Sequence, residues 1–124
     1  MSPLATALRA LGRGARRACA AWQAFWRGGR EPRLRVKLVA ERPRRPKRDR
    51  LYVTQQSGGA PAFGVLACPC GCGEVLNLRF FGARRPRWSV TWDEARRPTV
   101  EPSIWRQAGC RSHFHLVAGR IHWC

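Results

Sequence analysis

The pattern of apolar and polar positions divides the chain into an amphipathic N-terminal segment and a later series of short strands. In residues 3–27, apolar side chains recur every three or four positions, and arginines fall largely between them. This period predicts an amphipathic helix, which the Gly28-Gly29 pair would end. Residues 34–39 then alternate apolar and basic side chains, as a half-buried strand does.

The remainder of the chain continues in a pattern typical of strands. Short apolar or alternating runs predict further strands at residues 51–54, 63–67, 75–81, 88–92, 113–118 and 120–123. The last two flank Gly119 and are expected to form a closing hairpin, with His115 and His122 as surface histidines on its strands. The predicted fold class is mainly β, a small antiparallel domain preceded by a basic amphipathic helix.

Two domains are expected, the helix at residues 1–30 and the β domain at residues 31–124. Within the domain, residues 42–50 read RPRRPKRDR, and two prolines among six cationic side chains predict an exposed loop. The helix has three possible roles that its pattern leaves open. It could pack on the domain, dock on a partner or lie on an anionic membrane surface.

Composition narrows the function classes. A chain of 124 residues holds one small domain with a tail, which excludes the large α/β enzymes. No run approaches the roughly 18–20 apolar residues of a membrane span, so no span is expected. Residues 1–50 hold 15 basic and 3 acidic residues, or +12 of the net charge of +17. This excess indicates a polyanion contact through residues 1–50, with a charged surface that has no specific ligand as the plain alternative.

Six cysteines raise the question of disulfides or metal. Arginines at positions 9, 13, 16 and 17 interrupt every stretch that could serve as the apolar core of a secretory signal. The expected compartment is therefore a reducing cytoplasm, where clustered Cys and His indicate metal binding or catalysis. Cys19 stands alone in the N-terminal segment, while the other five cysteines fall between residues 68 and 124.

Two half-sites predict a tetrahedral structural zinc site with one ion per chain. Residues 68–73 read CPCGCG, and a C-x2-H pair follows about 40 residues later. The candidate ligands exceed four, and the preferred set is Cys70, Cys72, Cys110 and Cys124, with Cys68 and His113 next. Reduced cysteines buried as small apolar groups, or an iron–sulfur cluster, remain the alternatives.

A serine and a histidine near the second half-site form a candidate catalytic pair. Ser103 lies ten residues before His113 and could be a nucleophile with His113 as its general base. The orienting third group of a triad could then be Asp93, Glu94 or Glu101. The G-x-S-x-G and H-E-x-x-H motifs are absent. A turn or capping role for Ser103 is the alternative.

Several of these motifs occur together in one known family. CPCGCG, the RPRW stretch at residues 85–88, PSIW, GCRSHF and a terminal IHWC resemble domain-of-unknown-function family 6527, from about residue 50 to the end. The family consists of small bacterial, metal-binding proteins, often encoded near ubiquitin-like modifiers and their activating and conjugating enzymes. Its motifs map onto Cys68, Cys70, Cys72, Ser103, Cys110, His113 and Cys124.

The resemblance implies a role in a ubiquitin-like modification pathway. A deconjugating or processing serine peptidase is one such role, with Ser103 as nucleophile, His113 as base and zinc as a purely structural ion. Its partners would be a ubiquitin-like modifier or the conjugating enzymes. The alternative is a non-catalytic, zinc-stabilised module that binds protein or nucleic acid, in the second case by stacking bases on Trp88, Trp92 and Trp105.

Overall fold

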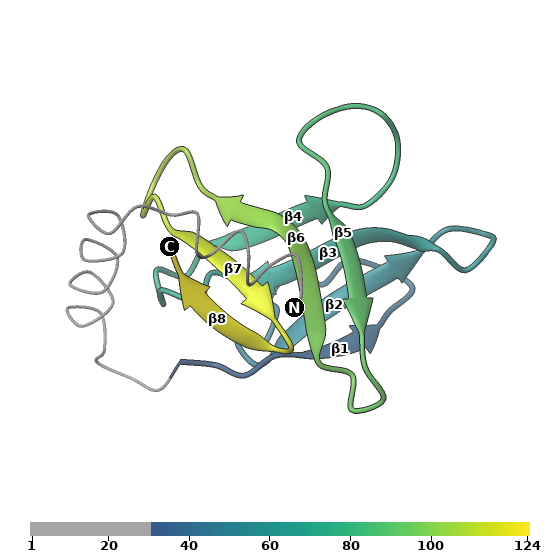
Figure 1. Cartoon of the computed structure of the whole chain (residues 1–124), viewed down its shortest axis with the longest axis horizontal. Helices are drawn as coiled ribbons and strands as arrows, with labels where there is room; N and C mark the ends of the chain where they lie inside the picture. The colour runs from purple at the N-terminus through teal and green to yellow at the C-terminus, as the bar shows by residue number, and fades with distance from the viewer. Residues whose placement is uncertain (1–30) are drawn as a thin grey trace, which may run out of the picture.

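The computed structural model describes residues 31–124, which form two four-stranded β-sheets around one hydrophobic core (Figure 1). The first sheet has the strand order β1-β2-β3-β4 and the second the order β5-β6-β7-β8. The strands are β1 (Arg35–Leu38), β2 (Arg50–Gln55), β3 (Pro61–Ala67), β4 (Val75–Arg79), β5 (Ser89–Trp92), β6 (Pro98–Trp105), β7 (His113–Val117) and β8 (Arg120–Trp123). The mainly β fold class is thus confirmed, while the helix predicted for residues 1–30 lies outside the described residues. The part that is described holds no helix long and apolar enough to cross a membrane.

Alternating side chains of the second sheet separate its core face from its outer face. In β7, Phe114 and Leu116 are fully buried in the shared core. His113 and His115 alternate with them and therefore point to the outer face of the sheet. His115 lies opposite His122 across the β7–β8 hairpin, as expected. His115 is nevertheless buried, so the prediction of a surface position is wrong for it and holds for the exposed His122.

One strand pair departs from the antiparallel prediction. β1 pairs with β2 in parallel, and the exposed 42–50 segment forms most of the connection between them. A parallel pair needs a long crossover, and this proline-rich loop supplies it. Residues 31–50 are thereby built into the folded unit. Of the segment predicted to contact polyanions, only residues 1–30 lie outside the described part.

The strand that carries Ser103 was missed in the sequence. β6 contains two prolines, which disfavour a central strand. Pro98 is the first residue of β6, and Pro102 lies where the register shifts between Val100 and Ile104, so neither proline interrupts regular pairing. Ser103 is consequently a strand residue beside an irregularity rather than a turn or capping residue.

The closing hairpin is confirmed and is tied to the start of the domain. Ala118 and Gly119 both have positive φ, at 48° and 78°, which suits a two-residue hairpin turn. A Cβ on Gly119 would lie 2.5 Å from the carbonyl oxygen of Leu34, so a side chain there would collide with the backbone. The same two segments are also joined by a hydrogen bond, in which the Leu34 amide donates to the Gly119 carbonyl.

Candidate metal centre and serine–histidine pair

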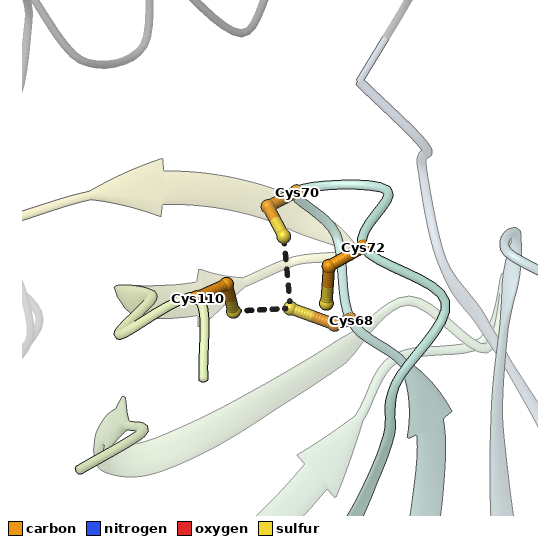
Figure 2. Close-up of side chains that lie close together, drawn as sticks. All are labelled: Cys68, Cys70, Cys72 and Cys110. Carbon is orange, nitrogen blue, oxygen red and sulfur yellow. Dashed lines mark hydrogen bonds between the residues drawn. The ribbon is translucent and has the colours of Figure 1, made fainter. Parts of the chain in front are cut away.

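Four cysteine side chains converge at one end of the two sheets. Cys68, Cys70 and Cys72 lie in the loop between β3 and β4, and Cys110 reaches them from the loop between β6 and β7 (Figure 2). Their four sulfur atoms all lie within 4.8 Å of one another. Gly71 and Gly73 make this convergence possible, because their positive φ values of 88° and 86° turn the chain on either side of Cys72.

The sulfur positions fit a four-thiolate metal site. A tetrahedral zinc ion with Zn–S bonds of about 2.3 Å sets its sulfurs about 3.8 Å apart. The Cys68 sulfur lies 3.4 Å from that of Cys70 and 3.6 Å from that of Cys110, and all four cysteines are free of disulfides. The donor set is therefore one that could hold zinc.

This cluster differs from the preferred ligand set, because it includes Cys68 and not Cys124. Cys124 was expected to return to Cys110 through the closing hairpin. It follows β8 instead, where its amide donates a 3.1 Å hydrogen bond to the carbonyl oxygen of His113. The His113 side chain is not in the cluster either, so it is available for another role.

Two neighbouring side chains bind the cysteine sulfurs. The hydroxyl of Ser112, which is fully buried, lies 3.0 Å from the Cys110 sulfur and 3.4 Å from the Cys68 sulfur. The Arg106 guanidinium donates to the sulfurs of Cys110 and Cys72, at 3.3 Å and 3.7 Å. Such partners orient metal ligands and offset the charge of a thiolate cluster. Neither residue was singled out as a sulfur partner in the sequence, where only closeness to Cys110 marks them.

The cysteines differ in how readily they ionise. Burial opposes ionisation of Cys110, but hydrogen bonds from Ser112 and from the Cys68 and Cys70 thiols outweigh it and lower the pKa of Cys110 to about 6. Burial raises the pKa of Cys68 well above its ordinary value and also raises that of Cys72. One thiolate is thus present near neutral pH, whereas the buried Cys68 would lose its proton on binding a metal.

Ser103 and His113 meet on the outer face of the second sheet. The Ser103 Oγ lies 2.9 Å from the His113 Nε2, across neighbouring strands β6 and β7. The indole N–H of Trp88 donates a 3.2 Å hydrogen bond to the Ser103 carbonyl, which holds the backbone at the irregular point of β6. Burial lowers the pKa of His113, so its ring is neutral near pH 7 and has a lone pair to accept a proton.

None of the acidic side chains considered for a triad, Asp93, Glu94 and Glu101, hydrogen-bonds to the His113 ring in the described part of the chain. Asp93 binds Arg97 instead, with 2.7 Å between Oδ2 and Nε. Within residues 31–124, Ser103 is the hydrogen-bond partner of the His113 ring, and no carboxylate bonds to it. The arrangement is therefore a pair rather than a triad of the carboxylate type.

The metal cluster and the serine–histidine pair are joined by one short loop. Trp105 and His113 are directly paired at the ends of β6 and β7. Just beyond them, the Arg106 amide donates a 2.8 Å hydrogen bond to the Ser112 carbonyl. Cys110 lies within the loop thus closed. The position of His113 consequently depends on the same segment that carries one of the four sulfurs.

Comparison with known proteins identifies the family. Residues 38–124 match the model of a family described as bacterial ubiquitination-like system serine protease (BubE), and the chain belongs to this family. The expected link to a bacterial ubiquitin-like system is thereby confirmed, although the matched family is not the one named from the motifs. No curated protein and no solved structure matches the chain.

Proposed function

We propose that this member of the family is a serine peptidase that processes or deconjugates a ubiquitin-like modifier. The observation that carries the proposal is the 2.9 Å contact between the Ser103 hydroxyl and the His113 ring. A nucleophilic serine needs a base within about 2.6–3.2 Å, and this pair meets that distance without substrate. The modifier and its conjugating enzymes are the protein partners that this role requires.

The reaction would follow the chemistry of acyl transfer. For the attack, the His113 proton must reside on Nδ1, which leaves Nε2 free to accept the Ser103 proton. The Ser103 oxygen then bonds to the scissile carbonyl carbon, and the imidazolium gives its proton to the leaving amine as the amide bond breaks. Water, deprotonated by the same ring, hydrolyses the resulting ester and restores the hydroxyl.

In this proposal zinc is structural and takes no part in bond breaking. Cys68, Cys70, Cys72 and Cys110 would supply four thiolates, which fill a tetrahedral shell and leave no position for water or substrate. What a bound ion would supply is rigidity at the end of the sheets. The residues of the 106–112 loop would then hold His113 facing Ser103.

The experiment uses the full-length, zinc-loaded protein and a ubiquitin-like modifier fused at its C-terminus to a short peptide. Cleavage is followed by gel and mass spectrometry. Ser103→Ala should lower the turnover number by roughly a thousandfold or more, since it removes the nucleophile. Zinc content and the unfolding transition should not change.

A matched control separates loss of the nucleophile from loss of any strand hydroxyl. Ser89 is an exposed serine on β5, and Ser89→Ala should cleave the fusion at the wild-type rate. Equal cleavage by the wild type and Ser103→Ala would contradict the proposal. An intact fusion with the wild type would do so as well, and a non-catalytic binding module would then explain the same residues.

A further inference from the structure

Trp105 covers one face of the His113 ring. The indole and imidazole centroids lie 5.1 Å apart, with only 16° between the ring planes, so the two rings are stacked. Trp105 and His113 are direct partners in the β6–β7 ladder, and the strand register therefore fixes the stack. The contact is part of the folded sheet rather than a chance meeting of mobile side chains.

Core packing does not account for this tryptophan. Trp105 is 57% exposed, whereas the preceding Ile104 is 3% exposed and belongs to the core. An exposed indole at the end of a strand contributes less to stability than a buried one. What Trp105 does contact is the ring of the proposed general base.

The proposed reaction requires a group that orients the His113 ring and stabilises its positive charge, and Ser103 does neither. During attack, the His113 ring becomes an imidazolium and must stay aligned with the Ser103 oxygen. In a triad, a carboxylate orients the ring and stabilises its charge. Within the described residues His113 has no such partner. The face of an indole attracts a cation through its quadrupole, and a flat stack also limits rotation of the imidazole.

We infer that Trp105 is the positioning residue of the Ser103–His113 pair, and that its indole face orients the imidazole and stabilises the imidazolium in place of a carboxylate. This inference rests on the proposed peptidase function.

Other titratable groups near His113 do not supply the missing stabilisation. His115 lies two residues along β7. Burial lowers the pKa of His115, and the positive charges of His113 and His122 lower it further. These neighbours are cationic when ionised and so oppose a second positive charge. Just after β8, the backbone amide of Cys124 donates a hydrogen bond to the His113 carbonyl. The indole is therefore the neighbouring ring that favours the charged imidazole.

The test compares Trp105→Phe with Trp105→Leu in the full-length, zinc-loaded protein. Phenylalanine and leucine are similar in size, so both leave the imidazole comparably shielded from water, but only phenylalanine keeps an aromatic face. An alanine variant would be less informative, because extra solvation would raise the His113 pKa while loss of the indole lowered it. Phe81→Leu is the control, since Phe81 is a partly exposed aromatic that packs on Phe63.

Two readouts are measured on each variant. NMR titration of the histidine rings gives the His113 pKa without any substrate, with the signal assigned by His113→Gln. Cleavage of the modifier fusion across pH gives kcat and KM. Relative to Trp105→Phe, we expect Trp105→Leu to lower the His113 pKa by about half a unit and kcat roughly threefold to tenfold. KM and zinc content should stay unchanged, and the Phe81 variant should behave as the wild type.

Each result decides the matter. If Trp105→Leu matches Trp105→Phe in kcat and in the His113 pKa, the positioning role is overturned while the peptidase proposal stands. If KM rises and both kcat and the pKa stay the same, Trp105 contacts substrate instead and the inference fails. If the wild type leaves the fusion intact, the peptidase function fails first and the inference fails with it.

Discussion

Ser112→Ala tests whether the sulfur cluster works as an ionised, metal-binding unit. The Ser112 hydroxyl has two sulfurs in reach, but it can donate only one proton at a time. The shorter contact, at 3.0 Å to Cys110, should therefore dominate. A hydrogen bond to a charged acceptor contributes about 1.5–3 kcal/mol, against about 1 kcal/mol for a neutral one. We expect the variant to lose about 2 kcal/mol of unfolding free energy when the cluster is ionised and metal-bound.

The assay is urea unfolding of the zinc-loaded protein under reducing conditions, followed by tryptophan fluorescence. Competition with a chelator measures zinc affinity in the same samples, which should fall together with stability. Ser89→Ala is the matched control, because Ser89 is exposed on β5 and, within residues 31–124, Ser112 is the serine that contacts the sulfurs. An unfolding free energy of Ser112→Ala within about 0.5 kcal/mol of the wild type would refute the reasoning.

Two further predictions concern the metal ligands and the acid range. Cys110→Ser should abolish binding of the expected single zinc ion, whereas Cys124→Ser should retain it. Metal analysis of the reduced protein measures both, and the opposite result would show that Cys124 is a ligand and Cys110 is not. Since burial lowers the pKa of His113, kcat/KM for the fusion should rise with pH to half its maximum below the ordinary value of 6.5. A midpoint at or above 6.5 would contradict the half-buried His113 as the base.

Periodicity in the sequence predicted most of the fold because the strands have distinct faces. β7 shows this clearly, with two core side chains alternating with two histidines. β6 was missed because its prolines resemble those of a turn; the structure accommodates Pro98 at the start of the strand and Pro102 at the register shift with β7. The sequence also could not predict whether β1 runs parallel or antiparallel to β2. A loop with the composition of residues 42–50 can connect strands in either arrangement, and the choice depends on contacts with residues distant in the sequence.

The choice of metal ligands also depended on tertiary structure that the sequence pattern does not reveal. In a strand, cysteines at alternate positions would share a face, with little reason to converge on one point. Gly71 and Gly73 bend the chain, and three sulfurs converge as a result. Glycine after cysteine indicated a turn, but the choice between Cys68 and Cys124 depended on where the last strand ended. That depends on the whole second sheet rather than on local spacing.

The position of the cysteine cluster explains why a metal would matter to a protein of this size. Three of the four sulfurs come from a loop of the first sheet, and Cys110 comes from a loop of the second. A bound ion would therefore link the two sheets at the end where β6 and β7 present Ser103 and His113. Small domains bury limited apolar surface and are marginal without such a link. The same ion would thus secure both the fold and the alignment of the proposed catalytic pair, through seven residues of one loop.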